Sequence, residues 1–226
     1  MLLQWSAPEY VPRSFLVSGV SGTNKAVKQT DTSFRLTKQV ADGLVDMQEV
    51  SKGLFLVQSE MAFKKETELC EEYPERKVFQ LSFCMNGICE WDYRQKRGEH
   101  YQLSPTQCSL QCGTFSQCVS RFGSEEPYRT LSISLEQERF LPLAEDLEAA
   151  HLIRRDNKIC THIFSTTPEI RLVLQQLLDC PPERKLRKLY LEGKVLELVS
   201  LFCEEAIGKQ KNDKEISRED YRCLMK

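Results

Sequence analysis

The apolar residues of this chain change their spacing once, near residue 136. Between about residues 43 and 135 they alternate with polar residues, in short runs that glycine and proline separate. From residue 138 onward they recur every three or four residues. Alternation is typical of half-buried strands, and the longer period is typical of amphipathic helices. The sequence therefore predicts an α+β protein, in which a β-barrel or sandwich precedes a helical part.

The strongest strand signal is the segment 77–93. Phe79, Leu81 and Phe83 alternate with polar residues there, and Asn86-Gly87 follows them. An Asn-Gly pair favours the two-residue turn of a β-hairpin, so we expect 77–93 to form one. Further short strands are expected at 53–61, 100–105, 107–113, 116–123 and 128–135.

The predicted helices differ in how clearly they begin and end. The first contains Pro142, and the second begins at Thr166 or Thr167, with Glu169 placed to complete a capping box with Thr166. The third stops near Gly208 and a polar linker follows it. The helices are expected at 138–150, 165–180, 183–208 and, as a fresh helix that the end of the sequence interrupts, 216–226.

The helix expected at 183–208 has an unusually wide apolar side. Its apolar residues cover about half of the circumference, whereas a helix packed on one core needs about 100°. Such a helix needs two partners. The first is expected to be the 165–180 helix with the sheet, and the second is either the same helix of a second subunit or the rest of its own domain. If the second partner is another subunit, the interface of the homodimer contains five apolar residues of this helix, namely Leu191, Val195, Leu198, Val199 and Phe202.

The composition limits the class of partner. The chain has 31 Lys and Arg against 33 Asp and Glu, for a formal net charge of -2. A nucleic-acid binder usually carries a basic excess, so this chain by itself is not expected to grip DNA. It has no apolar run of about 18 residues and no secretory leader, so we expect a cytoplasmic protein without membrane contact. Its ten cysteines are then expected to be reduced and mostly buried.

No motif in the chain indicates catalysis or a metal centre. The barrel segment holds a single histidine, His100, and one histidine cannot build a two-His, one-carboxylate iron site. Cys108, Cys112 and Cys118 lack the close C-x-x-C spacing of structural zinc sites, so we interpret them as buried packing. We predict no catalytic residue, no metal ligand and no required cofactor. A small metal-dependent enzyme remains one alternative.

Two segments resemble a known family. The segments 77–93 and 167–206 are similar to the N-terminal half of AraC/XylS-type transcription regulators, in the branch of the pyochelin-iron regulators. The resemblance implies a cupin-like β-barrel that binds a small effector, with a ferric chelate as one candidate, and helices that form a homodimer. Promoter DNA would be bound by a C-terminal helix-turn-helix domain that this sequence does not contain, and the segment 217–226 resembles the helix leading into it.

The resemblance also suggests a division of the chain and a ligand site. The expected parts are an N-terminal arm with short elements (1–42), the effector-binding barrel (43–137), the helical dimerisation part (138–208), and the linker with the start of a further helix (209–226). Small-molecule sites are mostly apolar and aromatic with a few polar groups. Candidate ligand-binding residues are therefore Phe79, Leu81, Phe83, Trp91, His100 and Arg121. Ordinary core packing is the alternative for the first three, and a filled barrel that only supports dimerisation is the alternative for the whole chain.

Overall fold

A computed structural model describes the backbone of residues 2–4, 14–17, 33–34, 38, 40–94 and 98–224. Side chains are described for residues 38, 40–71, 79–94 and 98–209. Three short strands fall within the region expected to be an arm, and the rest of that expectation lies outside the described residues. Within the described part, no helix is long and apolar enough to cross a membrane.

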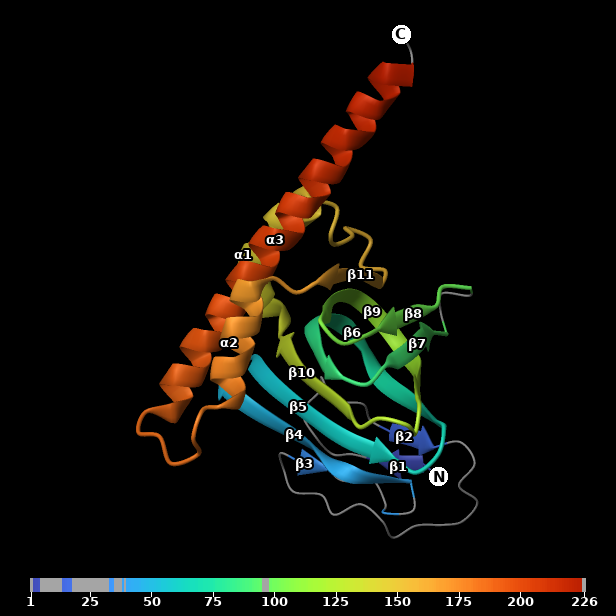
Figure 1. The fold of residues 1–226 in the computed structure, drawn as a ribbon, viewed down its shortest axis with the longest axis vertical. Coiled ribbons are helices and arrows are strands. Elements are labelled where there is room, and N and C mark those ends of the chain that lie inside the picture. Colours follow the sequence, from blue (N-terminus) through green and yellow to red (C-terminus); the bar gives the residue numbers. More distant parts are fainter. Residues whose placement is uncertain are drawn as a thin grey trace.

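The described strands form one strongly curved antiparallel sheet (Figure 1). Its main order is β3-β4-β5-β10-β6-β9-β7-β8, with β2 added beside β6, and β11 added beside β9. The strands are β1 (Leu2–Gln4), β2 (Ser14–Val17), β3 (Ser33–Phe34), β4 (Ala41–Ser51), β5 (Leu54–Phe63), β6 (Thr67–Asn86), β7 (Cys89–Tyr93), β8 (Tyr101–Leu103), β9 (Gln107–Phe122), β10 (Tyr128–Leu135) and β11 (Cys160–Ser165).

The predicted hairpin at 77–93 is wrong. Among the described pairings, β6 pairs with β2, β9 and β10, whereas β7 pairs with β8 and with the far edge of β9. Gly87 has a positive φ of 72°, but Asn86 does not share it, and a hairpin turn of this type needs both. The Asn86 side chain instead donates a 2.7 Å hydrogen bond to the carbonyl of Pro127. The chain therefore crosses from one edge of β9 to the other.

The two strands expected at 107–113 and 116–123 are a single strand, β9. Gly113 lies in its middle with a φ of 133°, and a Cβ placed there would lie 2.5 Å from Cα of Ile159. The glycine therefore bends the strand where the chain entering β11 approaches it, without ending it. On the same edge of β9, β11 pairs with its first half and β7 with its second half. The strand β11 was not predicted from the sequence.

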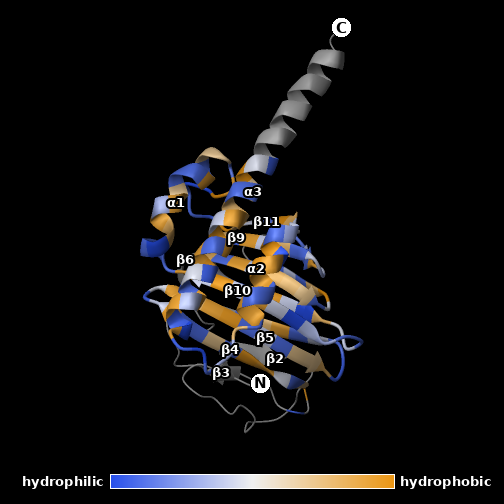
Figure 2. Ribbon diagram, turned by 60° about the vertical axis from the view of Figure 1, so that its left-hand side comes forward, coloured by the Kyte–Doolittle hydropathy of each residue, from blue (hydrophilic) through white to orange (hydrophobic). Residues whose placement is uncertain are grey.

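Three helices cover one face of the sheet (Figure 2). They are α1 (Gln137–Ala149), with Pro142 inside it, α2 (Pro168–Leu178) and α3 (Arg187–Leu224). The N-cap of α2 is Thr167, whose hydroxyl accepts a 3.3 Å bond from the backbone N–H of Ile170. The capping box expected between Thr166 and Glu169 does not form, because the Thr166 hydroxyl donates to the carbonyl of Thr106.

The expected linker at 209–215 is wrong, because α3 continues through it to Leu224 and projects beyond the sheet (Figure 1). No fresh helix begins at residue 216. Lys, Gln and Glu favour helix, and one glycine at position 208 costs only about 1 kcal/mol. The start was also misplaced, since α3 begins at Arg187 after a turn that contains Leu186 with a positive φ of 57°.

The buried residues form two separate groups, one on each face of the sheet. The first group lies between the sheet and the helices, and we call it the helix-side core. The second group fills the concave face on which β7 and β8 fold back, and we call this space the barrel interior. Because both faces are covered, a strand residue can be buried on either side.

Candidate functional site

Phe79, Leu81 and Phe83 lie in the helix-side core, not in the barrel interior. Each is fully buried. The ring of Phe79 stacks on Phe140 of α1 with 5.3 Å between centroids, and Phe83 meets Phe202 of α3 edge-on at 6.2 Å. These three side chains therefore follow the alternative of ordinary core packing, and the candidate site omits them.

The residues that alternate with Phe79, Leu81 and Phe83, together with their partners on neighbouring strands, give the barrel interior a polar wall. Antiparallel register places Ser134, Gln80, Gln111 and Thr161 in one row across four strands. Ser132, Ser82 and Ser109 form the next row. We call these seven residues the polar inner face. Within it, Ser82 Oγ accepts hydrogen bonds from Ser132 Oγ at 2.9 Å and from Gln80 Nε2 at 3.0 Å. All seven are uncharged.

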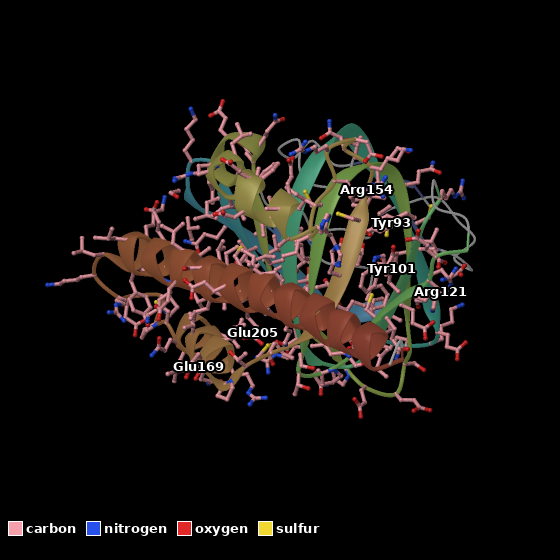
Figure 3. The ribbon with its side chains drawn as sticks, turned by 90° about the horizontal axis from the view of Figure 1, so that it is seen from above. Tyr93, Tyr101, Arg121, Arg154, Glu169 and Glu205 are labelled. Carbon is pink, nitrogen blue, oxygen red and sulfur yellow. The ribbon has the colours of Figure 1, made fainter. Side chains whose placement is uncertain are left out.

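An aromatic layer faces this wall. It consists of Trp91 and Tyr93 on β7, Tyr101 on β8 and Phe115 on β9. Trp91 and Tyr101 stack with 5.5 Å between ring centroids, and Tyr93 lies 5.9 Å from Tyr101 and 4.9 Å from Phe115. Figure 3 shows Tyr93 and Tyr101 beside each other near β11. Trp91 lies on the interior side.

A short hydrogen bond joins the wall to the layer. Tyr93 Oη donates to Gln111 Oε1 at 2.8 Å. Burial raises the pKa of the Tyr93 hydroxyl well above its ordinary value, and the nearby Thr161 and Trp91 lower it less. Burial also raises the pKa of Tyr101, whose hydroxyl donates to Glu99. Both tyrosines are therefore neutral hydrogen-bond donors at neutral pH.

Two polar atoms in this region are buried without a hydrogen-bond partner. They are Nε1 of Trp91 and Oγ1 of Thr161. Most buried polar atoms in proteins are paired, and an unpaired one costs about 1–3 kcal/mol. Both groups act on the Tyr93 hydroxyl and lower its pKa, but neither atom reaches a partner at the distance and angle of a hydrogen bond. The two walls of the barrel thus each present one unsatisfied hydrogen-bonding group at the same place.

His100 and Arg121 do not join Trp91 in the interior. Arg121 lies on the outer face of β9, where it bonds Glu68 at 2.9 Å and Asp92 at 2.5 Å, and His100 lies 3.0 Å from the same Asp92. Partial burial alone would raise the pKa of Asp92, but hydrogen bonds from His100 and Arg121 lower it below its usual range. The sequence could have shown that Arg121 lies on the outer face. Arg121 stands between Ser120 and Phe122 in a strand, so its side chain points away from the face that Ser120 and Phe122 share.

The five residues assigned to a dimer interface are buried within one chain. Each is at most 4% exposed and belongs to the helix-side core. They are Leu191, Val195, Leu198, Val199 and Phe202. The second partner of the wide apolar side of α3 is therefore the rest of its own domain. On the described helical surface, the exposed apolar side chains are instead Leu141 of α1, Leu172 of α2, and Leu189 and Leu196 of α3.

The three cysteines considered together in the sequence do not meet. Cys108 and Cys112 share the helix-side core, whereas Cys118 lies in the barrel interior. Within the described residues, no group of three or more His, Cys, Asp or Glu side chains is arranged to hold a metal ion.

Comparison with known proteins identifies the family. The family model described as the N-terminal domain of the regulatory protein PchR matches residues 42–217. This chain belongs to that family. The AraC-type resemblance and the α+β fold with a cupin-like barrel are thereby confirmed.

Solved structures with the same fold are also AraC-like. The AraC-like transcriptional activator CuxR has a TM-score of 0.50 at 8% identity, covering 82% of this chain and 61% of that protein. ToxT K231A from Vibrio cholerae has a TM-score of 0.52 at 12% identity, covering 73% of this chain and 59% of that protein. The match thus spans about three fifths of these neighbours. No curated protein matches the sequence.

Proposed function

We propose that this chain is the effector-binding regulatory region of a cytoplasmic AraC-family transcription regulator, with a binding role and not a catalytic one. A small molecule occupies the barrel interior between the polar inner face and the aromatic layer. Its binding controls promoter recognition by a helix-turn-helix domain of the whole regulator. Family membership supports the regulatory role, and the unsatisfied groups of Trp91 and Thr161 support a ligand at this place.

The observation that carries the proposal is the two-sided packing of β11. Its Thr161 and Ile163 face the barrel interior, while Phe164 packs edge-on against Phe202 of α3 with 5.6 Å between centroids. One residue further, the carbonyl of Ser165 accepts a 3.4 Å hydrogen bond from Lys209 of α3. A displacement of β11 by a ligand would therefore act directly on α3.

The helix α3 suits such a role because it is continuous. Its first part is buried in the helix-side core, and the same helix extends to Leu224 without a break (Figure 1). A continuous helix transmits a shift along its axis or a rotation about it more directly than a flexible linker does. In the whole regulator this helix would carry the signal towards the DNA-binding domain.

The proposal includes a ferric chelate as one candidate effector. This candidate comes from kinship with the PchR family alone. The described interior residues supply hydroxyl, amide and indole groups, which suit recognition of the organic part of a chelate. In that case the chelating molecule would bring all ligands of the iron, and the protein would supply none.

Homodimerisation is also part of the proposal, through a different surface from the one expected. Leu189 and Leu196 are 65% and 45% exposed, and Leu172 on the neighbouring α2 is 60% exposed. Leu189 and Leu196 are seven residues apart, so they lie on the same side of α3, as in paired helices. A second copy packed against this side would remove Leu189 and Leu196 from water.

Effector binding is tested by thermal unfolding of the purified chain with a panel of compounds. The panel contains ferric siderophore chelates, their iron-free forms and uncharged aromatic metabolites. A ligand at 100 times its Kd stabilises the native state by about 2.7 kcal/mol. For a chain of this length that raises Tm by about 5–11 °C. If no compound raises Tm, the effector-binding role is refuted.

Dimerisation is tested by the molar mass of the same chain in light scattering. A dimer has about twice the 26.2 kDa of one chain. The variant Leu196→Glu should dissociate it, because the carboxylate would be buried without a partner. Ile88→Glu is the matched control, since Ile88 is equally exposed but lies in the turn between β6 and β7. A monomeric wild-type chain at tens of micromolar would remove dimerisation and leave effector binding standing.

A further inference from the structure

We infer that the barrel interior takes an uncharged molecule with a flat aromatic body, which accepts a hydrogen bond from Trp91 and exchanges one with Thr161. This inference rests on the proposed function and names the chemical class of the effector. The class follows from three features of the interior, namely its uncharged polar inner face, its aromatic wall and its two unsatisfied atoms.

The polar inner face, as its seven described residues form it, disfavours an ionic ligand because none of these residues is charged. All seven residues of that face carry hydroxyl or amide groups. Among the described charged residues, Arg121 and Asp92 pair with each other on the outer face, and Glu99 accepts the hydrogen bond of the Tyr101 hydroxyl. Glu71, towards the other end of the interior, accepts a hydrogen bond from Ser120 at 3.3 Å. An ionic ligand would therefore leave water without gaining an opposite charge at the polar inner face, which is strongly unfavourable.

The aromatic layer favours a flat ring. Trp91 and Tyr101 lie nearly parallel, with 23° between their planes, and Tyr93 meets Tyr101 edge-on. Offset-stacked and edge-to-face contacts with an added ring are favourable beyond the apolar area that they bury. The serine and glutamine side chains of the polar inner face offer no comparable apolar surface against which a branched aliphatic molecule could pack. A planar ligand can lie against the aromatic layer while its edge reaches the polar inner face.

The two unsatisfied atoms define the hydrogen bonds of the ligand. The indole Nε1 of Trp91 can only donate, so the ligand must present an acceptor there. The Thr161 hydroxyl can donate or accept. Trp91 is 4% exposed, so water reaches its indole poorly. A carboxamide or a similar group on an aromatic ring supplies both functions.

The test compares three small probes of nearly equal shape. Benzamide is neutral, benzoate is an anion and benzylamine is a cation at neutral pH. Each is titrated into the ¹⁵N-labelled chain, and the indole N–H signals of Trp5 and Trp91, the two tryptophans of the sequence, are followed. Comparison with Trp91→Phe assigns the signals. We expect benzamide to shift the Trp91 signal, and benzoate and benzylamine to bind at least about tenfold more weakly.

Two variants of β11 locate the site. Thr161→Val keeps the shape of the side chain but removes its hydroxyl, and it should weaken benzamide binding by about threefold to tenfold. Ser165→Ala is the control, because it removes a hydroxyl from the exposed end of the same strand. Equal loss in both variants, or no loss in Thr161→Val, would show that the ligand binds elsewhere.

The remaining outcomes separate this inference from the proposed function. Binding of benzoate or benzylamine as tight as that of benzamide would refute the uncharged class. If a compound of the panel raises Tm but none of the three probes shifts Trp91, the chain binds an effector and this inference alone is wrong. If neither experiment detects binding, both the inference and the effector-binding role are wrong.

Discussion

Replacing Phe202 by alanine tests whether the wide apolar side of α3 is buried within one chain. Phe202 is 1% exposed and contacts the rings of Phe83 and Phe164 edge-on. Truncation of such a side chain leaves a cavity and typically costs about 3–5 kcal/mol. For a chain of this length the loss corresponds to a decrease in Tm of about 6–20 °C.

The assay is thermal and denaturant unfolding of the chain at several protein concentrations. Burial within one chain predicts that the loss of stability caused by Phe202→Ala does not change with concentration, whereas loss of a subunit contact would make it concentration-dependent. Leu141→Ala on α1, outside the proposed dimer surface, is the control, and as a substitution of a half-exposed residue it should cost about 0.5 kcal/mol or less. A loss below about 1 kcal/mol for Phe202→Ala, accompanied by a lower molar mass, would refute the reasoning and restore Phe202 to a dimer interface.

Three further predictions concern the sheet. Gly113→Ala should destabilise the fold by at least about 2 kcal/mol in denaturant unfolding, because of its positive φ and the close approach of β11, whereas Gly123→Ala, in open space, should change stability little. The pKa of Asp92 is lower in the folded chain than in the unfolded chain, so its ionised carboxylate stabilises the fold above the unfolded pKa, and this stabilisation is lost as pH falls through the folded pKa. Arg121→Gln should raise the folded pKa of Asp92 in an NMR titration. An unchanged pKa would contradict the assigned ion pairs. Burial raises the pKa of Cys108 to about 12, so iodoacetamide at pH 8 should label it in the native chain far more slowly than in the unfolded chain, and equal rates would contradict its burial.

The order of the elements was largely predictable from local pattern. Alternation located β5, β10 and the phenylalanine-rich part of β6, and the longer period located α1 and α2, because these signals depend only on neighbours along the chain. The ends of elements were less predictable. Gly113 and Gly208 are residues that often end an element, yet the strand β9 and the helix α3 continue through them.

The connections within the sheet were not predictable in the same way. Asn86-Gly87 is a hairpin signal, but β9 lies between β6 and β7 and pairs with both. The missed strand β11 is only six residues long, and its place is given by pairing with Gln107–Cys112, some fifty residues earlier. Pairing over such distances depends on how the whole sheet closes, and no local pattern carries that information.

The sequence by itself determined that strands with alternating apolar and polar residues come first and helices follow. It also determined that α3 needs apolar contact on about half of its circumference. Only the tertiary structure decided what makes that contact and which side of each strand faces the ligand space. Phe79, Leu81 and Phe83 were bound to be buried, but helices cover one face of the sheet and strands β7 and β8 cover the other. Alternation in the sequence shows only that the two faces of a strand differ in polarity. With burial available on both, the packing of distant segments places the phenylalanines under the helices and Gln80, Ser82 and Gln111 in the barrel interior.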